Sequence, residues 1–290
     1  MKSKKTYPVV LSIAGSDSSG GAGIQADLKT FSALGVYGAT AITAITAQNT
    51  IGVHSQLAIA PQMVYDQIMA VVEDLRPSFV KIGMLSNAEI VHAVAEALGK
   101  FSLNIVLDPV IVSTSGHRLL SLEAEETLKK ELLPLSTLIT PNLPEMRALT
   151  DMPLSSVDEK ECAARRLMEY GAKAILLKGG HEDGDTKTDI LYTASPNGIL
   201  SHTFTSETIA TQNTHGTGCT LSAAIAAYMA RGLSMEDAIK EAKKYVTEAI
   251  RAGADVAVGN GFGPVNHSFN PLEMSIILTN NYRTTLYETE

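Results

Sequence analysis

Hydrophobic and polar positions alternate along the chain in blocks that predict strands and helices in turn. Most of the apolar runs are separated by amphipathic or alanine-rich stretches with helical spacing. This alternation is typical of a parallel sheet covered by helices on both faces. The strand-like runs lie at residues 9–14, 41–46, 79–82, 104–107, 137–140 and 174–177. The pattern therefore predicts an α/β fold with a mostly parallel central sheet.

The later part of the chain has a different pattern. Residues 189–192 and 201–205 read as a small antiparallel hairpin, because the turn-like sequence Ser-Pro-Asn-Gly at 195–198 lies between them. Two long helices are predicted to follow, at about 217–231 and 234–252.

The division into domains follows from what the chain lacks. No linker, repeat or low-complexity segment interrupts it, so residues 1–270 are predicted to form one domain. Residues 271–290 are an extension of unknown role. It could be an extra strand, a partner-binding arm or a loose tail, and a frayed terminus is the default expectation.

The composition excludes several classes of protein. With 290 residues and 45% hydrophobic content, the chain can bury a large core. The net charge of -8 and the lack of any long basic run argue against nucleic acid or an anionic membrane as partner. The short apolar run near the N-terminus fits neither a signal peptide nor a membrane span, which predicts a cytoplasmic protein. Cys162 and Cys219 are too few for a disulfide framework or a zinc site.

A glycine-rich stretch, AGSDSSGGAG at residues 14–23, follows the first predicted strand and precedes a helical pattern. Gly21, Gly23 and Ala26 fit the dinucleotide fingerprint, which would indicate an NAD-type oxidoreductase. That fingerprint needs an acidic residue about 20 positions further on. The chain has none between Asp27 and Asp66, and it has no Walker motif either, so both readings lose support.

Polar side chains follow three of the predicted strands. Asp108 follows the strand at 104–107, and Lys178 follows the strand at 174–177. Asn142 and Glu145 lie just after the strand at 137–140. In an open α/β sheet, ligands bind beyond the carboxyl ends of the strands. These residues suit a hydrated Mg²⁺ and a phosphoryl group, although Asn142 could equally cap a helix and Glu145 could pair on its first turn.

The strongest local signal is THGTGCT at residues 214–220, which leads into an alanine-rich helix. Its glycines expose backbone N–H groups at a helix N-terminus, where an anion is stabilised. Cys219 lies in the first turn, so the helix dipole is expected to favour its thiolate and a role as base. The alternative is a buried, small hydrophobic side chain.

These stretches together resemble one family. The segments AGSDSSGGAGIQADLKT, ITAQNT, VKIGMLS, LDPVIVSTSG, ITPNLPE, LLKGGH and HGTGCTLSAAIAA occur in order over about residues 9–269. They are similar to the hydroxymethylpyrimidine/phosphomethylpyrimidine kinases, which belong to the ribokinase-like superfamily. The resemblance implies an ATP-dependent, Mg²⁺-requiring homodimer of thiamine biosynthesis. Such an enzyme phosphorylates 4-amino-5-hydroxymethyl-2-methylpyrimidine and then its monophosphate.

The resemblance also assigns site residues. Gly216, Thr217 and Gly218 are expected to form the anion hole, with Cys219 at the position of the catalytic base. ATP is expected to contact Asn142, Lys178 and the anion-hole glycines, and Mg²⁺ to bind near Asp108 and Glu145. The pyrimidine pocket is expected to consist of Gly15, Asp27, Gln48, Met84 and Val110.

The chemistry of two pocket residues fits an aminopyrimidine. The Gln48 amide offers a donor beside an acceptor, which can satisfy the exocyclic amine and a ring nitrogen together. Met84 offers a polarizable face to the ring. The alternatives are a vitamin B6 kinase with the same phosphate machinery and a non-catalytic pyrimidine sensor.

Overall fold

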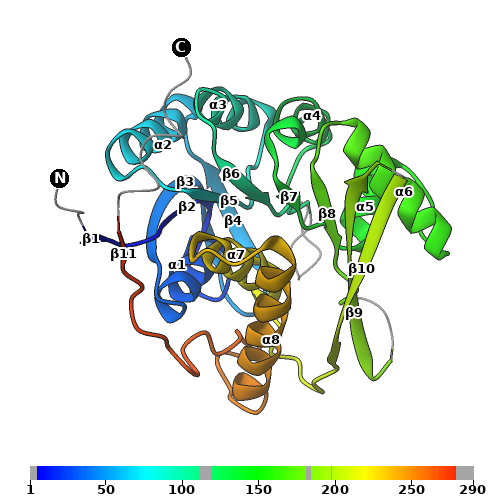
Figure 1. Cartoon of the computed structure of the whole chain (residues 1–290). Helices are drawn as coiled ribbons and strands as arrows, with labels where there is room; N and C mark the ends of the chain where they lie inside the picture. Colours follow the sequence, from blue (N-terminus) through cyan, green and yellow to red (C-terminus); the bar gives the residue numbers. More distant parts are fainter. Residues whose placement is uncertain (1–4, 112–118, 181–183, 197, 279–290) are drawn as a thin grey trace.

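The computed structural model describes residues 5–111, 119–180, 184–196 and 198–278, and a nine-stranded sheet runs through its centre (Figure 1). The strand order is β10-β9-β8-β7-β6-β5-β2-β3-β4. The six strands from β8 to β3 are parallel, whereas β4, β9 and β10 join by antiparallel pairing. The strands are β2 (Val9–Asp17), β3 (Tyr37–Gln48), β4 (Val53–Ala58), β5 (Phe79–Ile82), β6 (Asn104–Leu107), β7 (Leu138–Ile139), β8 (Ala174–Leu177), β9 (Thr186–Ser195) and β10 (Gly198–Glu207).

Helices cover both faces of this sheet, as the sequence pattern predicted (Figure 1). On one face lie α1 (Gly23–Ala33), α7 (Thr217–Ala230) and α8 (Met235–Gly253). The other face is covered by α2 (Pro61–Leu75), α3 (Ala88–Leu98), α4 (Leu122–Thr127), η1 (Leu128–Leu132), η2 (Leu133–Leu135), α5 (Leu143–Thr150) and α6 (Val157–Glu169). The fold class predicted from the sequence is therefore confirmed.

Helix α7 is the one that positions the candidate site. Residues on all of its sides are buried, which its small side chains permit because they let the helix lie close to the sheet and to α8. Its N-terminus lies near the segments that follow β2, β6 and β8, since β-carbons on Gly216 and Gly218 would lie close to Gly21, Asp108 and Lys178. The THGTGCT loop is thereby brought to the edge of the sheet where ligands are expected.

Several predicted boundaries change in the structure. The hairpin strands are longer than expected, with Thr205 paired to Thr188 and Ile199 to Ala194. Strand β7 is shorter than the predicted run and covers only two residues. Strand β4 was not predicted, because its side chains are mostly exposed at the sheet edge and do not form an apolar run.

The C-terminal extension is partly ordered. A short strand, β11 (Ile277–Leu278), pairs antiparallel with β1 (Lys5–Thr6). The N–H groups of Leu272 and Ser275 donate to the carbonyl oxygens of Ala33 and Gly35 over 2.7 and 2.8 Å. The default expectation of a frayed end is therefore wrong up to residue 278, and residues 279–290 lie outside the described part of the chain.

No helix in the described ranges is both long and apolar enough to cross a membrane.

Candidate functional site

The polar residues that follow β6, β7 and β8 meet at one point of the sheet edge. Lys178 Nζ lies 2.7 Å from Asp108 Oδ1 and 3.6 Å from Glu145 Oε2. A backbone bridge joins Asn142 to Lys178, since the two chain segments run parallel beyond their strands. The structure thus brings together the four residues that the sequence placed at strand ends.

Asn142 and Glu145 also have a local structural role. Asn142 Oδ1 accepts a hydrogen bond from the Glu145 N–H, and Glu145 Oε2 accepts one from the Asn142 N–H. This reciprocal pair is a capping box at the start of α5. The cap fixes the Glu145 carboxylate near Lys178, and a contact of Asn142 with ATP stays a prediction.

The pKa values of the three ionisable side chains at this point are shifted in different directions. Burial opposes ionisation of Asp108, but the charges of Lys178 and Lys81 and the hydrogen bonds from Lys178 and Thr140 outweigh it and lower the pKa. Burial raises the pKa of Glu145 to about 7, although Lys178 opposes this and Asp108 adds to it. Burial alone would lower the pKa of Lys178, but Asp108 and Glu145 raise it. The lysine is therefore fully charged at neutral pH.

The THGTGCT loop lies directly beside this cluster. Gly216 caps α7 with a φ of 82°, and a β-carbon there would lie 1.8 Å from the Gly21 carbonyl oxygen. Only glycine fits such a position. A β-carbon on Gly218 would lie 3.6 Å from Lys178 Nζ and 3.7 Å from Asp108 Oδ2. The helix N-terminus and the lysine therefore face the same small region, as an anion site requires.

The structure corrects one expectation for Cys219. Burial raises the pKa of the Cys219 thiol, and the charges of Asp27 and Asp108 add to this, whereas Lys81 and the N–H of Gly23 oppose it. The helix dipole was expected to favour the thiolate. Desolvation outweighs that effect, so the thiol is protonated at neutral pH.

Asp27 lies in a fully buried ion pair. Its carboxylate has no exposed surface, and Lys81 Nζ lies 2.9 Å from both of its oxygens. Ser12 donates a further hydrogen bond over 2.5 Å. Lys81 and Ser12 thus occupy its oxygens inside the protein, and a contact of Asp27 with the pyrimidine stays a prediction.

Three other predicted pocket residues come together. Met84 and Val110 belong to a small hydrophobic cluster that is separate from the two main cores. A β-carbon on Gly15 would lie 3.0 Å from Met84 Sδ, so the glycine lets the thioether approach the strand. Ala44 and Leu119 complete the cluster. Leu119 was missed, because nothing in the sequence shows that it packs back onto Met84.

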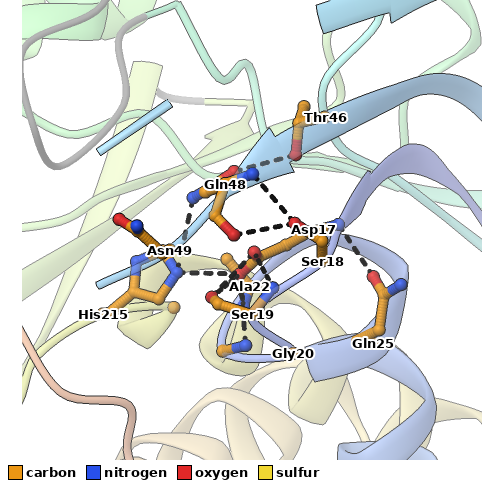
Figure 2. A network of polar contacts seen from close by, with 12 residues as sticks. Asp17, Ser18, Ser19, Gly20, Ala22, Gln25, Thr46, Gln48, Asn49 and His215 are labelled. Atoms are coloured by element: carbon orange, nitrogen blue, oxygen red, sulfur yellow. Dashed lines mark hydrogen bonds and ion pairs between the residues drawn. The ribbon is translucent and has the colours of Figure 1, made fainter. Parts of the chain in front are cut away.

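The glycine-rich loop that follows β2 binds a carboxylate of the protein itself, that of Asp17. Asp17 accepts hydrogen bonds from the N–H groups of Ser19, Gly21 and Ala22 over 2.8, 3.1 and 2.8 Å (Figure 2). His215 Nε2 lies 2.8 Å from the same carboxylate. The loop is therefore no phosphate cradle, because Asp17 uses the N–H groups that a ligand would need.

Asp17 and His215 were missed as site residues. Both lie inside motifs that were singled out, but the sequence does not show that they meet. Gln48 lies next to this pair, with its Nε2 3.4 Å from His215 Nε2. Gln48, which is predicted to bind the pyrimidine, thus contacts the residue that directly precedes the predicted anion hole at Gly216–Gly218.

Metal ligands are few in this region. In the described ranges no group of three or more His, Cys, Asp or Glu side chains could hold a metal ion. Asp108 and Glu145 supply two carboxylates, and Mg²⁺ typically binds through one or two carboxylates together with water and substrate phosphates. The donor set fits an ion that arrives with a nucleotide.

A parallel sheet with a charged lysine, two carboxylates and a glycine-rich helix N-terminus at its strand ends defines a kinase of the ribokinase-like class. The family model described as phosphomethylpyrimidine kinase matches residues 17–266. The chain belongs to this family.

Individual relatives agree with this assignment. The hydroxymethylpyrimidine/phosphomethylpyrimidine kinase of Escherichia coli K12 is 48% identical over 259 residues, which are 89% of this chain and 96% of the relative. The phosphomethylpyrimidine kinase structure from Clostridium difficile 630 has 45% identity and a TM-score of 0.72, and the match covers 83% of this chain and 99% of that one. Staphylococcus aureus pyridoxal kinase in complex with AMP-PCP and pyridoxal has 33% identity and a TM-score of 0.82, with 94% and 99% covered.

Proposed function

We propose that this protein transfers the γ-phosphoryl group of ATP to 4-amino-5-hydroxymethyl-2-methylpyrimidine and then to the resulting monophosphate. The observation that carries the proposal is the convergence of the α7 N-terminus, Lys178 and Asp108 at one point. Phosphoryl transfer depends mostly on positioning and on stabilising negative charge. This arrangement supplies both.

Each predicted phosphate-site residue has a distinct task in this proposal. The N–H groups of Gly218 and Cys219 face the transferring phosphoryl group, since a helix N-terminus has no intrahelical partners for them. The N–H of Thr217 instead donates to the Thr214 carbonyl oxygen over 3.2 Å. Lys178 neutralises charge on the ATP phosphates, and Asp108 and Glu145 hold its ammonium group in place. Removing such a preorganised donor typically lowers turnover by about 10²–10³-fold.

Asp108 and Glu145 are also the residues that would hold Mg²⁺ with the nucleotide phosphates. The ion would supply further neutralisation of the phosphate charge. Asn142 lies beside them at the start of α5 and is proposed to face the nucleotide.

Cys219 is proposed to orient the substrate hydroxymethyl group. The thiol is protonated at neutral pH, so it acts by contact and hydrogen bonding with the hydroxyl rather than as a preformed thiolate. In the second transfer the attacking phosphate oxygen is already largely ionised, because the second pKa of a phosphate monoester is about 6. The second step should therefore depend less on Cys219.

The pyrimidine ring is proposed to lie against Met84, Gly15 and Val110, with its amine and ring nitrogen on Gln48. Met84 and Val110 lie in one cluster, and the Met84 thioether lies against Gly15, so the three residues can form one wall of the ring site. A vitamin B6 kinase remains the second candidate, since pyridoxal kinase structures share the fold.

One experiment tests the function directly. The protein is incubated with Mg-ATP and the pyrimidine alcohol, its monophosphate or pyridoxal, and products are identified by mass. We expect two successive phosphoryl additions to the pyrimidine. Dominant turnover of pyridoxal would contradict the proposal, and binding of the pyrimidine without consumption of ATP would indicate a sensor. The homodimer and the cytoplasmic location stay predictions.

A further inference from the structure

The Gln48 carboxamide lies against two groups to which the proposed function gives no task. Gln48 Nε2 lies 3.4 Å from His215 Nε2, and Gln48 Oε1 lies 3.2 Å from Thr46 Oγ1. His215 is in turn 2.8 Å from Asp17 Oδ2. Figure 2 shows the His215 ring beside the Asp17 loop and the end of β3 that carries Gln48. His215 and Thr46 thus contact the amide that is expected to bind the ring, and Asp17 contacts His215.

The hydrogen on His215 Nε2 is directed to Asp17. Burial opposes ionisation of Asp17, but hydrogen bonds from His215, Ser19 and Ala22 outweigh it and lower the pKa to about 2. An ionised carboxylate can only accept hydrogen bonds, so the ring nitrogen beside it carries the proton. His215 Nε2 is therefore a donor, and it needs an acceptor on Gln48 rather than an NH₂ group.

The hydroxyl hydrogen of Thr46 is committed in the same way. Thr46 Oγ1 donates to the Ser16 carbonyl oxygen over 2.8 Å, a shorter contact than its 3.2 Å separation from Gln48 Oε1. A hydroxyl has one hydrogen, so its lone pairs are left to face Gln48. Thr46 therefore needs a donor from Gln48 rather than an oxygen.

A rotation of the Gln48 carboxamide that exchanges its oxygen and its NH₂ group provides hydrogen-bond partners for both His215 and Thr46. Its oxygen then shares the His215 Nε2–H with Asp17, and its NH₂ group donates to Thr46. The two ends of an amide are nearly equal in size, so the turn needs no additional space. We propose that Asp17, His215 and Thr46 are positioning residues that hold the Gln48 oxygen toward His215 and thereby determine which ring edge the pocket accepts.

This inference rests on the proposed function, in which Gln48 contacts the pyrimidine. Held by His215 and Thr46, the carboxamide still offers one lone pair and one N–H to a ligand. That pattern matches an exocyclic amine beside a ring nitrogen. The hydroxymethyl group must face the phosphate site, so the ring cannot turn over to match a carboxamide in the opposite orientation.

A 4-oxo analogue of the alcohol presents the reverse pattern. Its keto oxygen accepts where the amine donates, and its ring N–H donates where the nitrogen accepts. It can pair with Gln48 only after the carboxamide turns and loses its hydrogen bonds to His215 and Thr46. The pocket should therefore prefer the 4-amino alcohol strongly, and the preference should depend on His215.

The test compares kcat/KM for the 4-amino and 4-oxo alcohols with Mg-ATP. We expect His215→Leu to lower the ratio of the two values by about tenfold or more, as the loss of one orienting hydrogen bond implies. His215→Gln is the matched control, because its amide N–H can still donate to Asp17 and Gln48, and it should retain most of the preference. Thr46→Val should lower the ratio in the same direction. A purely structural role would lower both kcat/KM values together and leave the ratio unchanged.

The outcomes separate this inference from the function on which it rests. A wild-type protein that phosphorylates neither alcohol overturns the proposed function and the inference with it. A wild-type protein that accepts the amino alcohol, together with an unchanged ratio in folded His215→Leu, overturns the inference alone. If thermal unfolding shows that His215→Leu is not folded, the ratio in Thr46→Val decides the question in the same way.

Discussion

Lys81 and Asp27 form an ion pair with no exposed surface, in which the Lys81 Nζ lies 2.9 Å from both carboxylate oxygens. Burial alone would lower the pKa of Lys81, but the charges of Asp27 and Asp108 and the hydrogen bond to Asp27 outweigh it and raise the pKa. The pair therefore places a permanent positive charge close to the first turn of α7. It connects the end of β5 to α1 beneath the candidate reaction site.

Removing one member of this pair should strongly destabilise the protein. We expect Lys81→Met to reduce the free energy of unfolding by about 3–5 kcal/mol, because Asp27 is left as a buried charge without a partner. The double variant Lys81→Met/Asp27→Asn removes that charge and should recover part of the loss. Urea unfolding of the four proteins in this cycle measures the coupling. A double variant whose loss equals the sum of the two single losses would contradict the expected coupling.

Cys219 should contribute less to the rate of the alcohol step than a general base would. We expect Cys219→Ala to lower turnover of the pyrimidine alcohol by less than the 10²–10⁴-fold that is roughly typical of a lost base. Turnover of the monophosphate should fall by less still. Separate initial rates for the two steps measure this, and Cys219→Ser is the control that keeps a hydrogen-bonding group at the position.

The pH dependence of the alcohol step checks the same point. Burial raises the pKa of Cys219 above its usual 9.0, so a thiolate mechanism predicts a rate that climbs with pH beyond that value. We expect no such rise that depends on the cysteine. A steep rise in the wild type that disappears in Cys219→Ser would show that the thiolate is the base.

His267 should make the protein sensitive to mild acid. Its ring contacts the first turn of α7, with Nε2 3.0 Å from Thr220 Oγ1. Burial, with smaller contributions from Lys29 and His215, lowers the pKa of His267 from 6.5 to about 4. The unfolded chain therefore binds a proton at a higher pH than the folded one. Stability that is fully present above pH 6.5 is lost as the pH falls to about 4, in total about 3 kcal/mol.

The measurement is the free energy of unfolding between pH 7 and pH 4 for the wild type and for His267→Gln. Glutamine does not titrate, so the variant should lose less stability over that interval, even if it is less stable at pH 7. If the free energy of unfolding changes equally with pH in the two proteins, His267 is not the group responsible.

Two buried tyrosines provide a matched pair for stability. In the described part of the chain, the Tyr192 hydroxyl is the single buried side-chain polar atom with no hydrogen-bond partner. The Tyr245 hydroxyl donates to the His267 carbonyl oxygen over 2.6 Å. We expect Tyr192→Phe to be neutral or to stabilise the protein by about 1 kcal/mol, and Tyr245→Phe to destabilise it by about 1–2 kcal/mol. Thermal unfolding measures both, and a loss of stability in Tyr192→Phe would mean that its hydroxyl has a partner.

Much of the fold was predictable from local patterns. The apolar runs at 79–82, 104–107 and 174–177 coincide with β5, β6 and β8, because buried parallel strands are short and continuously apolar. Strand β4 has no such run, since its side chains face solvent at the edge of the sheet. The pairing of β11 with β1 joins the two ends of the described chain, a contact that no local pattern reveals.

The candidate site likewise has features that were predictable from the sequence and features that were not. The sequence by itself determined the order of the elements and the polar residues that follow each strand, because strand ends, glycines and helix starts have local signatures. Only the tertiary structure decided how each polar group is satisfied. Asp17 and His215 are 198 residues apart, yet their contact fills the glycine loop that had looked free for a ligand. Burial likewise reversed the expected state of the Cys219 thiol, because a pKa depends on every charge and on the solvent around the group in the folded chain.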